Sequence, residues 1–347
     1  MAYSINAKDY FNTKLYTGNG STNAITGVGF ATDMTWCKKT NSAQDHALVD
    51  AVRGVTEVIY PNASHTQTTD ANSLTAFDSD GFTLGSSGDF NQNSDSYASW
   101  NWKLGTTSGI TTNGSTTITP VAYSFNATTG MSAIKCTGTG AAGLFPHGLG
   151  VAPKIVISKR LNDTNSWYVQ TDLITSWTSS NFLTLNTTTG VGNSTDIINA
   201  TDATNVSLAS ADDWVNKSGD SYIHYCFAEK AGFSKFGTYL GNGSDDGPFI
   251  YTGFKVAWLV IKRTDTTDGW FMYDNKRSTF NAVNDYLLTN ANSAEVESAA
   301  VDVDFLSNGF KLRNDDGGHN NSSGTYLFLA FAEAPVVGSN NIAATAR

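Results

Sequence analysis

The sequence predicts an all-β protein made of three tandem, diverged β-sandwich domains of the jelly-roll or lectin-like type. Charged side chains make up only 15% of the 347 residues, so Asn, Ser, Thr and Gly must supply much of the polar surface. These residue types favour turns and short strands over helices. A block of strand, glycine-rich turn and β-branched strand occurs three times, and helical periodicity is weak throughout.

The repeated block keeps the same order of features in each copy. Its first strand and glycine-rich turn lie at 14–21, 135–140 and 238–244, its β-branched strand with a basic end at 34–39, 154–160 and 257–263, and its closing aromatic strand at 97–102, 222–227 and 326–331. The spacing between copies, roughly 100 to 125 residues, suits one small sandwich each and is too long for a solenoid or propeller repeat.

Short apolar runs separated by turn signals define the individual strands. Runs such as 258–262 and 328–331 are nearly continuous, as expected for strands inside a two-sheet core. Asx-Gly pairs between such runs supply the positive φ that tight hairpins need. These pairs are Asn19-Gly20, Asp80-Gly81, Asn242-Gly243 and Asn308-Gly309. Only residues 292–300 are expected to form one or two helical turns.

Composition shifts along the chain set the expected domain boundaries. We expect an arm at 1–13, copy 1 at 14–105, a Ser/Thr/Gly-rich linker and lead-in strand at 106–133, copy 2 at 134–231, copy 3 at 232–335, and a second arm at 336–347. The long linker leaves copy 1 room to sit apart, whereas the short connection between copies 2 and 3 implies that these two touch.

Charge and cysteine usage exclude several classes of protein. The formal net charge is −10, and no basic stripe is present, so nucleic-acid binding is not expected. Three widely spaced cysteines indicate buried free thiols rather than a disulfide framework or a zinc site. No run approaches 18 apolar residues, so membrane insertion is not expected, and the N-terminal residues lack the pattern of a secretory signal.

The candidate catalytic residues favour structural roles, so we predict no enzyme, no cofactor and no metal site. Glu229 and Glu333 are the best acid candidates, yet they occupy the same position in two copies, as a structural role would produce. The five histidines show no metal-binding spacing, and no nucleophile elbow is present. The acidic turn at 78–81 aligns with 306–309, where Asn308 replaces Asp80, so the shared requirement is a turn and not a calcium site.

Two acid–base pairs recur at one position of the repeat. Asp50 and Arg53 in copy 1 match Asp274 and Arg277 in copy 3, and copy 2 lacks this element. A salt bridge in a bulged turn between sheets is the simpler interpretation. A contact to a neighbouring subunit is the alternative, since Arg makes bidentate contacts to carboxylates.

Three tryptophans of copy 2, Trp167, Trp177 and Trp214, lie in polar stretches of the sequence. A sugar ring could stack on such side chains. Packing between subunits would use the same residue type, and composition alone does not separate the two interpretations.

Six segments resemble a family of virion proteins that is widespread in phages of marine and aquatic bacteria, cyanobacteria included. They are Tyr10–Ser21, Asp50–Gly54, Phe77–Phe82, Ala98–Lys103, Gly148–Lys154 and Gly247–Phe254. The resemblance runs over nearly the whole chain and ends in the Phe331–Pro335 segment and a terminal Ala-Arg. It implies a structural or tail-fibre-like protein with lectin-like sandwiches and no catalytic motif.

The expected role is therefore a particle-surface protein that is assembled in the host cytoplasm and released on lysis. Its expected partners are other virion proteins, copies of itself and host cell-surface glycans. A tail-fibre or appendage component that attaches to host glycans is the first hypothesis, and a capsid decoration protein is the alternative. A polysaccharide depolymerase is a third, and it lacks a convincing pair of carboxylates.

Overall fold

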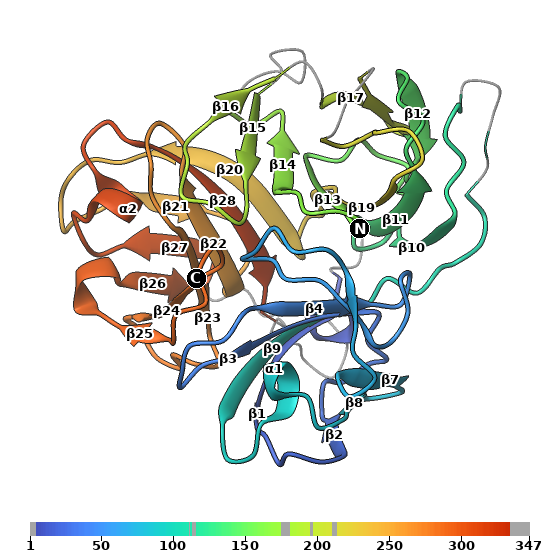
Figure 1. Ribbon diagram of the computed structural model, residues 1–347. Coiled ribbons are helices and arrows are strands. Elements are labelled where there is room, and N and C mark those ends of the chain that lie inside the picture. The colour runs from blue at the N-terminus through green and yellow to red at the C-terminus, as the bar shows by residue number, and fades with distance from the viewer. Residues whose placement is uncertain are drawn as a thin grey trace.

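The computed structural model shows an almost entirely antiparallel β protein, which confirms the predicted fold class (Figure 1). The structure describes residues 5–110, 112, 116–174, 181–194, 197–209 and 214–333. Among these residues no helix has the length and apolar character needed to cross a membrane.

The first part of the chain, copy 1, starts with a 3₁₀ turn at Ala7–Asp9. Its strands are β1 (Phe11–Thr17), β2 (Asn23–Thr26), β3 (Met34–Lys39), β4 (Ala47–Asp50), β5 (Glu57–Val58), β6 (Thr68–Thr69), β7 (Leu74–Asp78), β8 (Gly81–Leu84) and β9 (Ser96–Trp102), with the single-turn helix α1 (Gly88–Asn91) before β9.

Copy 2 carries one additional strand at its start. Its strands are β10 (Ala122–Asn126), β11 (Met131–Thr137), β12 (Gly143–Pro146), β13 (Ile155–Arg160), β14 (Trp167–Thr171), β15 (Asn181–Thr184), β16 (Gly192–Asn193), β17 (Ile198–Thr201), β18 (Asn205–Leu208) and β19 (Ser221–Phe227). Strand β10 is the predicted lead-in strand, and β11 begins three residues before the expected boundary at 134.

Copy 3 repeats this order near the other end of the described chain. Its elements are β20 (Ser234–Leu240), β21 (Phe249–Tyr251), β22 (Val256–Arg263), β23 (Trp270–Asp274), β24 (Asp285–Leu288), β25 (Val296–Glu297), a 3₁₀ turn (Ala299–Val301), β26 (Val303–Leu306), β27 (Gly309–Leu312), α2 (Gly317–Asn320) and β28 (Thr325–Ala332). The helical turns expected within 292–300 are thus reduced to a short strand and one 3₁₀ turn.

Each copy has one large and one small sheet whose shared strands follow the same order, and copy 1 has in addition the two-stranded sheet β5-β6. The large sheets run β1-β9-β3-β4, β10-β11-β19-β13-β14-β15-β16 and β20-β28-β22-β23-β24-β25, and the small sheets run β2-β8-β7, β12-β18-β17 and β21-β27-β26. With the additional strand β10 left aside, the first strand of every copy therefore pairs with the last, and the second strand pairs with the one before the last. This shared topology agrees with the repeat seen in the sequence.

The glycine-rich turn after the first strand is held by a buried asparagine in each copy. The side chains of Asn91, Asn216 and Asn320 accept a hydrogen bond from the turn backbone at Asn19, Thr139 and Asn242, each at 2.8 Å. The glycine that follows each turn residue has a positive φ, between 64° and 70°. The predicted turns with a positive-φ glycine at Asn19-Gly20 and Asn242-Gly243 are confirmed. They are not hairpins, because each turn leads from the large sheet to the small sheet of its copy: β1 pairs with β9 and β2 with β8, and β20 pairs with β28 and β21 with β27.

The inner strands of the large sheets are buried on both faces, which explains their continuous apolar runs, whereas the edge strands β1 and β20 are partly exposed. All six residues of β3 and of β13 are buried. One face packs against the small sheet of the same copy, as Cys37 and Val49 do against Phe82. The other face, with Trp36 and Trp100, packs into a core that all three copies share.

Phe331 lies at the centre of this shared core. Its ring contacts aromatic rings of every copy, at centroid distances between 5.4 and 6.4 Å; these rings are Phe11, Trp102, Phe227, Phe236 and Trp258. Figure 1 shows the three groups of strands, blue, green and orange-red, placed around this common centre. The expectation that copy 1 sits apart is therefore wrong, because a long linker permits separation but the aromatic inner faces exclude it.

Equivalent loops join the copies head to tail into a closed ring. The amide of Asn165 in copy 2 donates to Ser64 O in copy 1 at 3.0 Å, and Asp268 N in copy 3 donates to Thr188 O in copy 2 at 2.8 Å. Gln44 N in copy 1 closes the circle by donating to Asn292 O in copy 3 at 2.8 Å. Each copy thus contacts the next through the same loop.

The expected N-terminal arm is part of this core. Ala7 and Phe11 are buried, and the Phe11 ring stacks on Phe331, so the boundary at residue 13 is wrong for the described residues 5–13. The expected C-terminal arm at 336–347 lies outside the described residues. The three cysteines are free and buried, as predicted.

Candidate ligand-binding surfaces

The two predicted acid–base pairs lie inside the ring and not on its surface. Asp50 and Arg53 form a buried salt bridge at 2.6 Å, and Asp274 and Arg277 form an equivalent one at 2.6 Å. Each aspartate also accepts hydrogen bonds from the backbone of the turn that follows it. The simpler interpretation, a salt bridge in a turn, is correct.

Each buried aspartate also receives a hydrogen bond from the next copy of the ring. Tyr225 Oη of copy 2 donates to Asp50 at 2.5 Å, and Trp100 Nε1 of copy 1 donates to Asp274 at 3.1 Å. Burial raises the pKa of Tyr225 well above its ordinary value, and the charge of Asp50 adds to this effect. Because the side chains of both pairs are enclosed, the alternative of a contact to a separate subunit is wrong. The partner of each pair is a neighbouring repeat within the same chain.

Copy 2 replaces the pair with apolar and neutral residues. Thr171 stands at the position of Asp50, and its hydroxyl accepts the equivalent hydrogen bond from Leu173 N at 3.1 Å. Ile174 takes the place of Arg53 and packs against the shared core. The ring thus tolerates an uncharged version of this junction.

Of the three predicted tryptophans, two are described, and both pack against other residues of the chain. Trp167 is buried, and its Nε1 donates to Tyr60 O at 2.9 Å across the junction of copies 1 and 2. Trp214 is partly buried and stacks on Tyr168 at 4.8 Å, against the core of copy 2. Trp177 lies outside the described residues. A glycan-stacking role for Trp167 is wrong, because its strand is buried on both faces.

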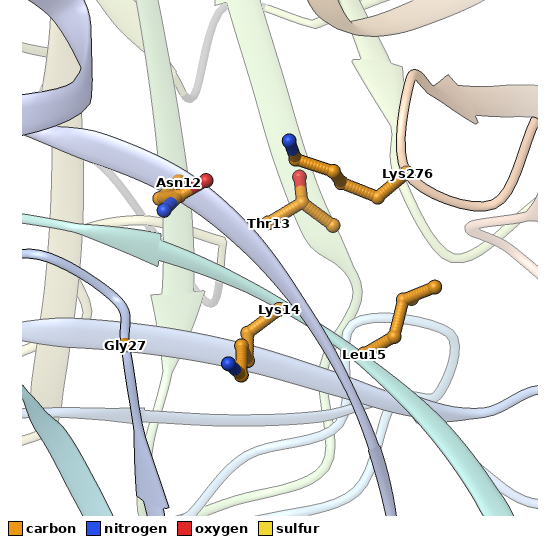
Figure 2. Close-up of a pocket in the computed structure, with 6 residues that line it drawn as sticks. All are labelled: Asn12, Thr13, Lys14, Leu15, Gly27 and Lys276. Carbon is orange, nitrogen blue, oxygen red and sulfur yellow. The ribbon is translucent and has the colours of Figure 1, made fainter. Parts of the chain in front are cut away.

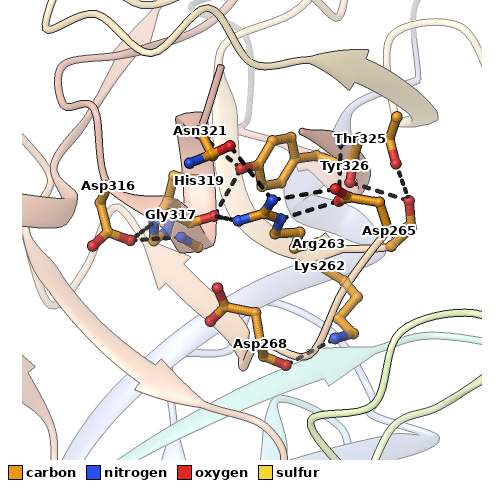
Figure 3. A network of polar contacts seen from close by, with 12 residues as sticks. Lys262, Arg263, Asp265, Asp268, Asp316, Gly317, His319, Asn321, Thr325 and Tyr326 are labelled. Atoms are coloured by element: carbon orange, nitrogen blue, oxygen red, sulfur yellow. Dashed lines mark hydrogen bonds and ion pairs between the residues drawn. The ribbon is translucent and has the colours of Figure 1, made fainter. Parts of the chain in front are cut away.

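Buried lysines form a second set of junction contacts. Lys159 Nζ donates to Ser64 O of copy 1 at 3.1 Å, and Lys262 Nζ donates to Thr188 O of copy 2 at 3.0 Å. Figure 3 shows Lys262 beside the partly exposed Arg263–Asp265 pair, at the edge of this network. Burial lowers the pKa of both lysines to about 8. Their amines bind carbonyls between copies and do not face a cleft.

Two polar clusters resemble catalytic groups but are enclosed. His224 Nδ1 and Ser158 Oγ lie 2.8 Å apart, and both residues are buried. His319 contacts Tyr273 at 2.6 Å and Asp316 at 3.5 Å, again with a buried imidazole. Glu229 and Glu333 form ion pairs with Lys235 and Lys255. Among the described residues no three metal-ligating side chains gather.

We expect the buried histidines to make the folded protein less stable below about pH 6.5. Burial lowers the pKa of His224 to about 3, and it also lowers the pKa values of His46, His147 and His319. In this range the unfolded state binds more protons than the folded state, so stability is complete above the unfolded pKa and is lost as the pH falls. We expect each fully neutral histidine to remove about 1.4 kcal/mol of unfolding free energy per pH unit.

A variant that carries the equivalent residues of copy 3 isolates the contribution of His224 to the pH dependence of the unfolding free energy. Copy 3 carries Ile261 and Phe328 at the positions of Ser158 and His224, so we expect the double variant Ser158→Ile/His224→Phe to fold. Urea unfolding at a series of pH values should show a loss between pH 7 and pH 5 that is smaller than in the wild type by about 2 kcal/mol. Parallel curves for the two proteins would contradict the assignment of a neutral buried His224.

An open groove, the seam groove, lies where the edge of β1 meets copy 3 (Figure 2). Its volume is about 350 Å³, and it is lined by Asn12, Thr13, Lys14, Leu15, Gly27 and Lys276. A second hollow of about 340 Å³ continues along β1 and is lined by Leu15, Tyr16 and Thr17 together with residues that include Arg277 and Glu295. The seam is therefore a hollowed surface between two copies.

A pair of aromatic side chains, the aromatic pair, lies on the outer face of the small sheet of copy 3. Phe249 is 44% exposed and Tyr251 is 64% exposed, while Ile250 between them is buried. A Cβ atom at Gly309 would lie 2.8 Å from the Phe249 ring. The absence of a side chain at Gly309 thus lets the ring lie directly against β27.

Neither surface was recognisable as a site from the sequence. The run Pro248–Tyr251 has the pattern of a buried strand, and only its place at a sheet edge leaves the two aromatics open. Lys14 and Lys276 are far apart in the chain, and the ring brings them together. The signal that could have identified the aromatic pair is the comparison of copies, since Ala24 and Thr26 stand at the equivalent positions of copy 1.

Comparison with known proteins gives a family without a described activity. A search of curated proteins found no match. The model of one family, described as a domain of unknown function, DUF7483, matches residues 6–335. This range includes all three copies and both candidate surfaces, and the chain therefore belongs to the DUF7483 family.

Proposed function

We propose that this chain is a non-catalytic structural protein of the surface of a phage particle, and that it attaches to host-surface glycans through the aromatic pair. The resemblance to virion proteins supports the location, with assembly in the host cytoplasm and release on lysis. The exposure of Phe249 and Tyr251 is the observation that carries the attachment role.

The fold does not require aromatic residues at these two positions. Strand pairing places Ala24 and Thr26 of copy 1, and Leu144 and Pro146 of copy 2, where copy 3 has Phe249 and Tyr251. The exposure of aromatic side chains to water is also unfavourable, and nothing in the fold of the single chain compensates for it. A ligand with apolar ring faces would remove this surface from water, and sugar rings have such faces together with hydroxyl groups.

The charges around the aromatic pair favour a neutral sugar. Lys311, opposite Phe249 on β27, pairs with Asp246 at 2.8 Å, and Asp304 on β26 pairs with Arg313 at 2.5 Å. These pairs leave polar edges that can exchange hydrogen bonds with hydroxyls, and they balance each other in charge. The ligand expected here is therefore an uncharged saccharide.

Binding to a glycan array, followed by titration of the best neutral oligosaccharide, tests this role. The variant Phe249→Ala/Tyr251→Thr introduces the residues of copy 1, so it should fold and bind at least about tenfold more weakly, since stacking contributes roughly 1 kcal/mol or more per ring. Val121→Thr, which removes an exposed apolar side chain elsewhere, is the control and should bind like the wild type. Unchanged binding by the double variant, or no neutral glycan bound by the wild type, would contradict the proposal.

Capsid decoration is a second candidate function, and the closed ring favours it. Three copies around one centre present similar faces in three directions, which suits a position among three neighbouring shell subunits. Copy number on a stained gel of purified virions separates the two placements, because decoration requires hundreds of copies and an appendage requires a few dozen at most. Cryo-microscopy of the particle would then locate the density.

A further inference from the structure

We propose that the seam groove binds a single anionic group, the carboxylate or sulfate of an acidic sugar unit. This site is separate from the aromatic pair, and the inference goes beyond the proposed function. It depends on two cations, one buried hydroxyl and a comparison with the other junctions of the ring.

Lys14 and Lys276 come from different copies and line the same groove. Neither Nζ atom has a hydrogen bond or ion pair within the part of the chain that the structure describes. By contrast, Lys154, Lys235 and Lys255 form ion pairs with Asp172, Glu229 and Glu333. In a chain with a net charge of −10, two unpaired cations that flank one groove from opposite sides of β1 (Figure 2) form a local positive site.

Asp80 is the carboxylate beside this site, and the backbone already holds it. Its two oxygens accept hydrogen bonds from Gly29 N at 2.6 Å and from Gly27 N at 3.0 Å. These two bonds are the main reason why the pKa of Asp80 is lowered, and the charge of Lys14 adds a smaller effect. The Nζ atom of Lys14 therefore remains available to a second anion.

Thr13 places a polar atom at the floor of the groove. The residue is 4% exposed, and its Oγ1 has no hydrogen-bond partner. In Figure 2 the Thr13 hydroxyl lies on the side of β1 that faces the Lys276 side chain. A buried hydroxyl without a partner is unfavourable, and a ligand oxygen held by Lys276 would supply the missing acceptor.

None of these three side chains is required by the fold. Strand pairing places Ala133 and Phe236 at the position of Thr13, and Ile134 and Gly237 at the position of Lys14. The turn position of Lys276 is Val52 in copy 1 and Leu173 in copy 2. All three polar side chains thus occur together at one junction of the ring. At the other two junctions the equivalent positions carry apolar residues or glycine.

The size and charge of the surroundings define the ligand. A volume of about 350 Å³ lies at the small end of the range for small-molecule sites. The acidic molecule as a whole repels a long polyanion such as nucleic acid. A single acidic group on an otherwise neutral sugar satisfies both conditions.

Titration followed by amide NMR tests the site with matched probes. Glucuronate and glucose differ by one carboxylate, and we expect glucuronate alone to shift the amide signals of Leu15 and Gly27. Glucose 6-sulfate tests whether the site binds a sulfate ester of a sugar, and inorganic sulfate tests whether it binds a free ion. The variant Lys14→Ile/Lys276→Val introduces residues of copies 2 and 1 and should weaken glucuronate binding by about tenfold.

Two controls separate this inference from the proposed function. Lys135→Gln removes a cation of copy 2 outside the groove and should leave glucuronate binding unchanged. Phe249→Ala/Tyr251→Thr should also retain it, whatever its effect on neutral glycans. Equal shifts with glucose, unchanged affinity in the double lysine variant, inorganic sulfate as tight as the sulfated sugar, or tighter binding of duplex DNA would each overturn the assignment.

Discussion

Replacing Arg53 with Met should lower the free energy of unfolding by about 3–5 kcal/mol, because the change leaves Asp50 buried and without a counter-charge. Asp50 is fully enclosed, and Arg53 also donates to the carbonyls of Leu48 and Glu57. Tyr225 of copy 2 would then face an uncompensated carboxylate. Denaturant unfolding of the wild type and the variant measures the difference.

Copy 2 supplies the control for this experiment. At the positions of Asp50 and Arg53, copy 2 has Thr171 and Ile174. Copy 3, which follows copy 2 in the ring, has Leu329 at the position of Tyr225. The triple variant Asp50→Thr/Arg53→Ile/Tyr225→Leu should therefore recover most of the lost stability, since apolar replacement of a whole buried charge network is often neutral. A triple variant as unstable as Arg53→Met would show that the charged network itself stabilises the junction.

Replacing Phe331 with Ala should destabilise all three copies together, by about 3–5 kcal/mol. Its ring contacts Phe11 and Trp102 of copy 1, Phe227 of copy 2 and Trp258 of copy 3. Removing it leaves a cavity in the core that joins them. Hydrogen exchange should therefore rise in β3, β13 and β22 at once.

Phe82→Ala is the matched control, because Phe82 is equally buried but lies in the core between the two sheets of copy 1. Its exchange increase should be largest in copy 1. An increase confined to copy 3 in Phe331→Ala would contradict a core shared by all copies.

Local features of the fold could be predicted because they depend on neighbouring residues. Asn19-Gly20 and Asn242-Gly243 are turn sequences whichever sheets surround them, and the aromatic closing strands mark the end of each copy. The same patterns, read three times in one order, indicated a repeated β unit.

The shared core could not be predicted in this way. The pattern of apolar residues around Trp36 and Trp100 would be the same in an isolated sandwich. Their positions in the sequence do not show that the sheet face on which they lie packs against another copy. The same limit explains the error at Trp167, whose polar neighbours in the sequence suggested exposure. Asp50 and Arg53 were correctly identified as a pair, but their partner Tyr225 lies 175 residues away.

The position of Phe331 has a consequence for biosynthesis. The ribosome synthesises β28 after every other described strand. Until Phe331 has been added, the aromatic inner faces of the first two copies therefore lack the ring that joins them. Products interrupted before β28 would leave these faces exposed to solvent, and we expect them to aggregate or be degraded. The shared core is thus completed only once β28 has been synthesised.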